Sequence, residues 1–183
     1  MLLGGNCPLS LSDDPTALFA AAGKLKTLKR RGWAKAGIIN SESVADHSFR
    51  MAIIGAFLAD MMKLDSGKII RMCLIHDIAE SEIGDLTPEE KESEEEHRKQ
   101  EDTAARSIFD TLPPKARKML LQDWTELMGM RTNEAKLVWQ IDKLEMGLTM
   151  KDYMRAGGDK KKLKEFNPSW FLSKELKSIL EKY

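Results

Sequence analysis

Cysteine and histidine are both scarce in this chain of 183 residues, which has two of the first and three of the second. Cys7 and Cys73 lie far apart, one in a polar stretch and the other in an apolar run, so we do not expect a disulfide framework. Neither cysteine has a histidine close to it in sequence, which argues against a cysteine nucleophile. This cysteine usage is typical of a soluble protein in a reducing compartment such as the cytoplasm.

Long apolar runs and an excess of charge of one sign are also absent. The longest apolar run, residues 51–59, is well short of the ~18 residues that span a bilayer, and the N-terminus has no signal-peptide pattern. Twenty-nine basic residues balance 29 acidic ones, so no overall field attracts nucleic acid or anionic lipid. The densest basic cluster, residues 160–162, follows two glycines in an expected loop and is interpreted as solvated surface. We therefore expect neither a membrane nor a nucleic acid polymer as a partner.

Two common enzyme motifs are missing too. The chain has no glycine-rich GxxxxGKS phosphate loop and no GxSxG turn, which excludes P-loop kinases and serine hydrolases of the usual type. No convincing stretch alternates apolar and polar residues as a half-buried strand does. Apolar side chains instead recur at helical spacing.

Helix start signals mark most of the chain. Asp14 precedes Pro15, Ser43 precedes an apolar periodic stretch, and Thr132 precedes another, each in a position typical of an N-cap. We expect helices over about residues 14–28, 43–62, 68–84, 89–100, 113–127 and 132–154, and a short one after Pro168. The predicted fold is an all-α bundle, a single domain over residues 1–183 with its core at about 14–155 and a C-terminal extension at 156–183.

Two imidazoles and two carboxylates stand in apolar, helix-like surroundings. His76 and Asp77 are adjacent in an apolar segment, with His47 upstream and Asp142 downstream. Burying such groups without partners costs several kcal/mol, and a shared cation would remove that cost. The mixed donor set suits Mn, Fe, Co, Ni or Zn better than Ca or Mg. On these residues alone, ordinary core histidines explain the pattern about as well as a metal site does.

A third carboxylate accompanies this set. Glu80 is four residues after His76 and three after Asp77, so on one continuous helix it would share a face with both. The sequence therefore predicts an additional acid beside the candidate ion.

The order of these motifs resembles that of the HD-domain metal-dependent phosphohydrolases. The resemblance is carried by residues 42–47, 76–80, 84–85 and 141–143. From about residue 25 to 153 the chain is similar to the compact 5′-deoxynucleotidases of that superfamily. It implies an all-α HD domain, a homodimer and one divalent ion (Mn or Co, or else Mg, Zn, Fe or Ni), with the metal ligands His47, His76, Asp77 and Asp142.

The resemblance also implies roles for other residues. Glu80 matches a carboxylate that orients the attacking water, and Asp85 matches one that contacts the nucleotide sugar or assists its departure. Arg31 and Trp33 match a phosphate-binding arginine and a tryptophan near the sugar. Here Gly32 separates the two, whereas bacterial members have arginine directly before tryptophan, and an acidic run at residues 89–96 replaces a more basic stretch. Trp33 could equally be a hydrophobic plug at the end of the bundle.

The implied reaction is hydrolysis of (deoxy)nucleoside 5′-monophosphates to nucleoside and phosphate. One alternative is an HD-type hydrolase of another nucleotide, such as a cyclic nucleotide, a nucleoside triphosphate or guanosine tetraphosphate. Three histidines, His47, His76 and His97, are too few for the two-metal cyclic phosphodiesterases. A second alternative is a non-catalytic dimer module that binds metal or nucleotide. Base and sugar preference depend on the shape of the pocket.

Overall fold

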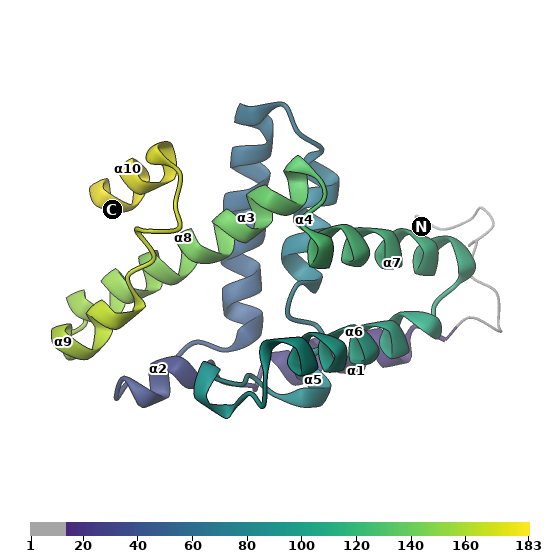
Figure 1. Cartoon of the computed structure of the whole chain (residues 1–183), viewed down its shortest axis with the longest axis horizontal. Coiled ribbons are helices and arrows are strands. Elements are labelled where there is room, and N and C mark those ends of the chain that lie inside the picture. Colours follow the sequence, from purple (N-terminus) through teal and green to yellow (C-terminus); the bar gives the residue numbers. More distant parts are fainter. Residues whose placement is uncertain (1–13) are drawn as a thin grey trace, which may run out of the picture.

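The structure, a computed structural model, describes residues 14–183 as an assembly of helices without a strand in that range (Figure 1). In chain order they are α1 (Thr16–Leu25), α2 (Arg31–Lys35), α3 (Val44–Met62), α4 (Ser66–Ile75), α5 (Glu80–Ile83), η1 (Pro88–Glu90), α6 (Glu94–Asp110), α7 (Pro114–Gly129), α8 (Asn133–Arg155), α9 (Lys160–Leu163), η2 (Lys164–Phe166) and α10 (Lys174–Lys182). The all-α prediction is confirmed. None of these helices has both the length and the apolar composition that crossing a membrane requires.

Three helices, α3, α4 and α8, form the centre of the molecule, and α8 crosses α3 in Figure 1. The Ser43 side chain accepts a hydrogen bond from the amide of Asp46, and the Asp46 side chain accepts one from the amide of Ser43. This capping box starts α3 as expected. Gly55 lets α4 approach closely, because a Cβ there would lie 2.9 Å from the side chain of Ile69. The tight packing of α3 on α4 fixes the position of α3 relative to the turn that follows α4.

The remaining helices pack around this centre. Phe109 of α6 and Trp124 of α7 are buried in a second apolar cluster with parts of α1. The C-terminal region lies on α8, where Leu176 and Leu180 of α10 enter the central cluster. The expectation of a loop at 160–162 was wrong, because the Asp159 side chain caps the short helix α9 there.

The structure departs from the sequence-based expectation at His76. The predicted helix from about 68 to 84 breaks: α4 ends at Ile75, and residues 76–79 form a turn before α5. The His76 Nδ1–H donates to the carbonyl of Cys73 at 2.8 Å, which is the acceptor that a continuing helix would offer to the amide of Asp77. The amide of Glu80 bonds instead to the carbonyl of Asp77, three residues back. Similarly, α6 begins at Glu94 and not at residue 89, since η1 and its Thr87 cap intervene.

Candidate metal centre and active site

The four predicted metal ligands converge from three parts of the fold. His47 comes from α3, His76 and Asp77 from the turn between α4 and α5, and Asp142 from α8. His47 Nε2 lies 3.3 Å from Asp142 Oδ1 and 4.0 Å from Asp77 Oδ2, and His76 Nε2 lies 2.9 Å from Asp77 Oδ2. The centroids of the two imidazole rings are 5.2 Å apart. Residues distant in sequence thus surround a single point.

The two imidazoles are held so that the same nitrogen of each faces this point. The Nδ1–H of His47 donates to the Glu145 carboxylate, and that of His76 to the Cys73 carbonyl. Both Nε2 atoms are buried and form no hydrogen bond with any group in residues 14–183. One ligand atom each from His47, His76 and Asp142 lie within 4.8 Å of one another. This donor set fits a divalent cation that two imidazoles and carboxylates share.

The electrostatics of the cluster also favour a cation. Burial raises the pKa of Asp77, but His76, His47 and Arg30 outweigh it and hold that pKa at about 2. Burial and Arg30 lower the pKa of His47, but Asp142 and Glu145 outweigh them and raise it to about 9. The acids therefore attract positive charge to this point, and a metal ion can replace the proton on His47.

Glu80 lies at the start of α5, close enough to Asp77 and Asp85 to be influenced by both charges. Burial raises its pKa to about 10, and Asp77 and Asp85 add to the effect. Its Oε2 atom is buried and has no hydrogen-bond partner among residues 14–183. A nearby cation would lower this pKa and leave a carboxylate able to accept a proton.

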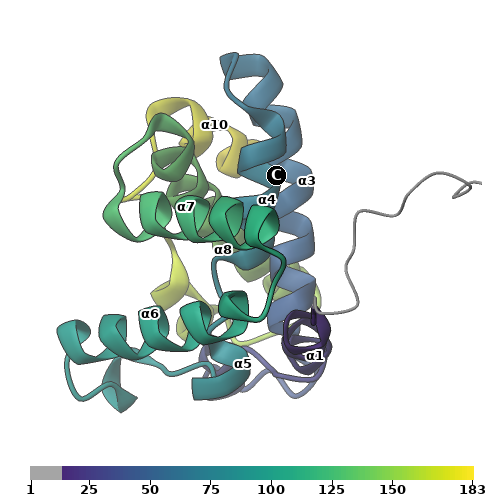
Figure 2. The same ribbon diagram turned by 90° about the vertical axis from the view of Figure 1, so that its right-hand side faces the viewer.

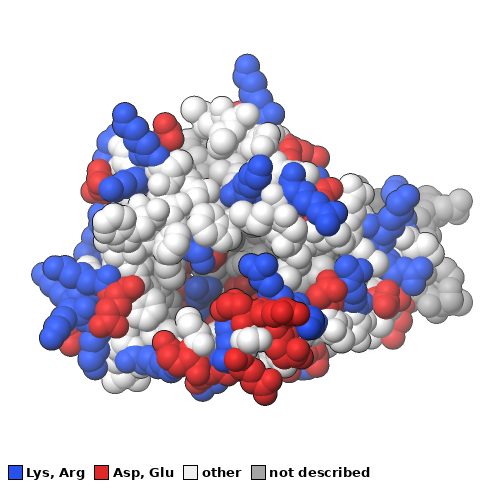
Figure 3. All heavy atoms as spheres, viewed as in Figure 1, with Lys and Arg blue, Asp and Glu red and all other residues white. Residues whose placement is uncertain are grey.

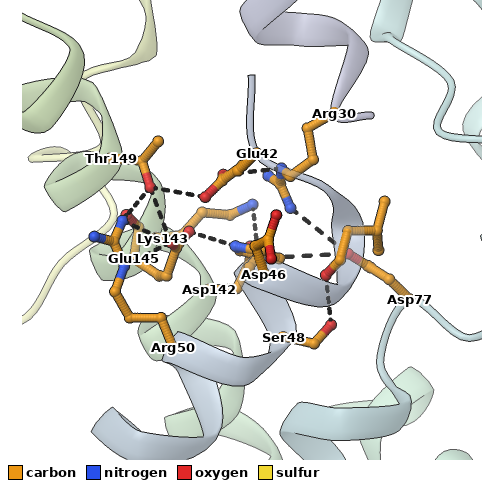
Figure 4. Close-up of polar contacts among 12 residues, drawn as sticks. Arg30, Glu42, Asp46, Ser48, Arg50, Asp77, Asp142, Lys143, Glu145 and Thr149 are labelled. Carbon is orange, nitrogen blue, oxygen red and sulfur yellow. Dashed lines mark hydrogen bonds and ion pairs between the residues drawn. The ribbon is translucent and has the colours of Figure 1, made fainter. Parts of the chain in front are cut away.

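Arg30, which the sequence interpretation missed, is the arginine beside the cluster (Figure 4). Its guanidinium reaches between two acids, 3.6 Å from Asp77 and 3.7 Å from Glu42. The side chain of Arg31 points elsewhere: it is 51% exposed and pairs with Glu90 at 2.6 Å. The sequence signal for Arg30 was the pair of adjacent arginines before Gly32, since either of them could point toward the cluster.

Asp85 and Trp33 lie on the side of the cluster next to Arg30. Asp85 accepts a hydrogen bond from the backbone amide of Arg31. Trp33 is only 2% exposed and its Nε1–H donates to Glu42 at 2.9 Å, while its ring packs on Tyr153 and Phe166. Trp33 therefore plugs the end of the bundle, and one side of it still lines a cavity of about 120 Å³ together with Arg30 and Asp85.

A second layer of polar groups supports the candidate ligands, and sequence reasoning missed it. Glu145 is fully buried and binds both His47 and Arg50, the latter at 2.7 Å (Figure 4). Thr149 donates to the same carboxylate at 2.9 Å. The sequence offered one weak signal for Glu145. It is three residues after Asp142, so the two share a face of α8.

Acids of the run at residues 89–96 pair with basic side chains at the rim of the site. Asp and Glu side chains gather over η1 and the beginning of α6 in Figure 3. Glu89 pairs with Lys35 at 3.1 Å and Glu90 with Arg31 at 2.6 Å, so these acids neutralise basic groups at the rim. Two basic side chains remain next to the cluster: Arg30 lies between Asp77 and Glu42, and Lys143 pairs with Asp142 at 2.8 Å.

Comparison with known proteins matches these features to one family. The HD domain family profile matches residues 22–181. A protein of Dictyostelium discoideum named 5′-deoxynucleotidase HDDC2 is 42% identical over 142 residues, which cover 74% of this chain and 75% of the relative. The mouse protein of the same name is 35% identical over 147 residues, covering 80% of this chain and 73% of the relative. Among solved structures, the PH0347 protein of Pyrococcus horikoshii superposes with a TM-score of 0.73 and 30% identity, covering 91% of this chain and 96% of that one.

Proposed function

The chain belongs to the HD domain family, and we propose that it hydrolyses deoxynucleoside 5′-monophosphates to nucleoside and phosphate with the help of one divalent cation. The observation that carries this proposal is the pair of buried, unbonded Nε2 atoms of His47 and His76, which face Asp142 beside the buried Oε2 atom of Glu80. The names of the relatives support the choice of reaction.

Hydrolysis of a phosphomonoester requires that negative charge on the phosphoryl group be neutralised and that water be deprotonated. A divalent cation bound by His47, His76, Asp77 and Asp142 supplies Lewis acidity toward a phosphoryl oxygen and toward water. In the proposed mechanism, Arg30 adds positive charge at the phosphoryl oxygens.

Glu80 accepts the proton of the attacking water as the new P–O bond forms. The bond from phosphorus to the 5′-oxygen breaks, and that oxygen takes up a proton. Asp85 either delivers this proton or binds a hydroxyl of the sugar. Both roles fit its place beside Arg30 in the cavity of about 120 Å³.

We further propose that two copies of the chain associate through α3. Figure 2 shows this helix along the edge of the molecule. Phe49, Ile53, Phe57 and Met61 follow one another at four-residue spacing on its outer face, each between 59% and 70% exposed. A continuous stripe of four large apolar side chains on the surface is typical of an interface. A two-fold axis would bring the stripe onto itself, as in most homodimers.

The experiment that tests the proposed reaction measures phosphate release by the purified protein after removal of metal and reloading with Mn, Co, Mg or Zn. The substrate panel contains deoxy- and ribonucleoside mono-, di- and triphosphates and cyclic nucleotides. We expect metal-dependent release from the 5′-monophosphates. Release only from triphosphates or cyclic nucleotides, or none with any metal, would contradict the proposal.

A further inference from the structure

Two hollows beside the candidate metal centre adjoin each other and share part of their lining. The inner cavity of about 120 Å³ touches Arg30 and Asp85. The outer groove has a volume of about 600 Å³ and extends toward Lys35 and Lys162. The walls that the two share are Gly32, Thr87, Pro88, Met146 and Phe166.

The sizes of the two hollows suggest how a nucleotide divides between them. The inner cavity is small for a whole nucleoside, whereas the outer groove lies within the range of about 300 to 1,000 Å³ usual for small-molecule sites. A phosphate beside Arg30 and a sugar near Asp85 would direct the base outward. A larger groove of about 790 Å³ between α3 and α10 has no lining residue in common with the inner cavity, as far as the described residues go, and so does not continue the reaction site.

One aromatic ring forms a wall that both hollows share. Phe166 of η2 packs on Trp33 with ring centroids 4.5 Å apart. It also lies against Gly32, where an added Cβ would be 3.0 Å from the ring. Contacts with Trp33 and Gly32 hold the ring in place before any ligand arrives, which favours stacking because little side-chain entropy remains to be lost.

The chemistry of the groove suits a nucleobase. Phe166, Met146 and Pro88 provide an apolar wall. The polar groups at the rim are of both signs, from Lys35, Lys162, Glu89 and Glu165. Aromatic rings stack on any of the bases, since each base has a π-face. A sugar phosphate without a base would leave this wall unused.

We propose that the outer groove binds the nucleobase of the substrate, with Phe166 as the stacking surface that makes the enzyme favour nucleotides over base-free sugar phosphates. The inference rests on the proposed function for the reaction at the inner end of the site. It assigns to Phe166 a contribution to substrate binding and none to the bond-breaking step.

The test compares deoxyadenosine 5′-monophosphate with 2-deoxyribose 5-phosphate, which has the same sugar and phosphate but no base. We expect wild-type kcat/KM to favour the nucleotide, and Phe166→Ala to reduce that preference about 10-fold, mainly through KM for the nucleotide. The kcat/KM with deoxyribose 5-phosphate should fall less than that with the nucleotide, because this substrate has no base to stack on the ring. An unchanged preference in Phe166→Ala would overturn the inference.

Controls separate this result from a folding defect. Phe166→Leu keeps apolar bulk against Trp33 while removing the aromatic face, and should also lose the preference. Phe171→Ala removes an exposed phenylalanine in the same C-terminal region and should have no effect. A metal content equal to that of wild type, measured by elemental analysis, reports an intact metal centre in each variant.

Binding of free deoxyadenosine, measured by calorimetry, tests the groove without catalysis. We expect Phe166→Ala to weaken it about 10-fold. If wild type hydrolyses both esters equally well and Phe166→Ala binds deoxyadenosine as wild type does, the base site is wrong while the phosphatase proposal stands. If neither ester is hydrolysed, the proposed function fails, and calorimetry alone decides the groove.

Discussion

His47 donates its Nδ1–H to Glu145, a carboxylate with no exposed surface that also binds Arg50 and Thr149. This hydrogen bond holds Nδ1 toward Glu145 and leaves Nε2 as the nitrogen that faces the candidate ion, which would replace the proton on it. Two further partners, Arg50 and Thr149, hold Glu145 itself in place, so the orientation of the imidazole depends on a network that extends from α3 to α8.

We predict that Glu145→Gln lowers the affinity for the metal about 10- to 100-fold, because the amide is a weaker and less directional partner for the imidazole. A metal titration with the purified variant measures this. Glu175→Gln, at an exposed position on α10, is the control and should bind metal as wild type does. Unchanged affinity in Glu145→Gln would remove this residue from the support of the site.

Arg30 and Arg31 provide a matched pair of variants. Arg30→Ala should reduce kcat/KM by about 10²-fold or more, since it removes charge placed 3.6 Å from Asp77, next to the expected phosphoryl site. Arg31→Ala should change it only a few-fold, because that side chain pairs with Glu90 at the surface. Steady-state kinetics with a deoxynucleoside monophosphate decide between them. The reverse order of effects would return the phosphate-binding role to Arg31.

Glu80→Gln should leave the metal content unchanged and lower kcat by about 10²-fold or more, as expected for the loss of a general base. Elemental analysis and turnover, measured on the same sample, test the two halves of this prediction. Near wild-type turnover would exclude Glu80 from the proton transfer.

The pKa of Glu80 also predicts the pH dependence of stability in metal-free protein. Its pKa rises from an ordinary value of 4.5 to about 10 in the folded chain, first because of burial. The stability that protonated Glu80 contributes is complete below pH 4.5 and is lost progressively as the pH rises toward about 10. Glu80→Gln should therefore raise the melting temperature of metal-free protein more at pH 8 than at pH 5. An equal shift at both values would contradict the raised pKa.

The α3 stripe predicts the oligomeric state. Phe57→Glu should convert a dimer to a monomer by placing a charge in the apolar contact, as measured by light scattering after gel filtration. Phe19→Glu, at a similarly exposed phenylalanine on α1, should leave the dimer intact. A wild-type monomer, or a dimer that survives Phe57→Glu, would refute this interface.

The sequence was sufficient for features that depend on local chemistry. Ser43 and Thr132 mark helix starts because their side chains accept bonds from nearby amides, and both caps are present. The predicted convergence of His47, His76 and Asp142 rested on the resemblance in motif order, and the structure brings these residues together.

Features set by side-chain direction could not be predicted. The helix break at His76 results from a hydrogen bond between its ring and the Cys73 carbonyl, which apolar periodicity does not reveal. Which of the two arginines lies beside the cluster depends on how α2 begins and on two ion pairs. Arg30 pairs with Glu42, and Arg31 pairs with Glu90 at the surface. In sequence, Glu145 is simply another acid on a helix.

The most direct measurement is phosphate release from a deoxynucleoside 5′-monophosphate by metal-stripped protein, titrated with Mn²⁺. We predict no activity before the titration, a rise with added metal and saturation near one ion per chain, with no rise in His76→Ala. Full activity in the stripped protein, or an undiminished response in His76→Ala, would contradict a metal centre built on His47, His76, Asp77 and Asp142.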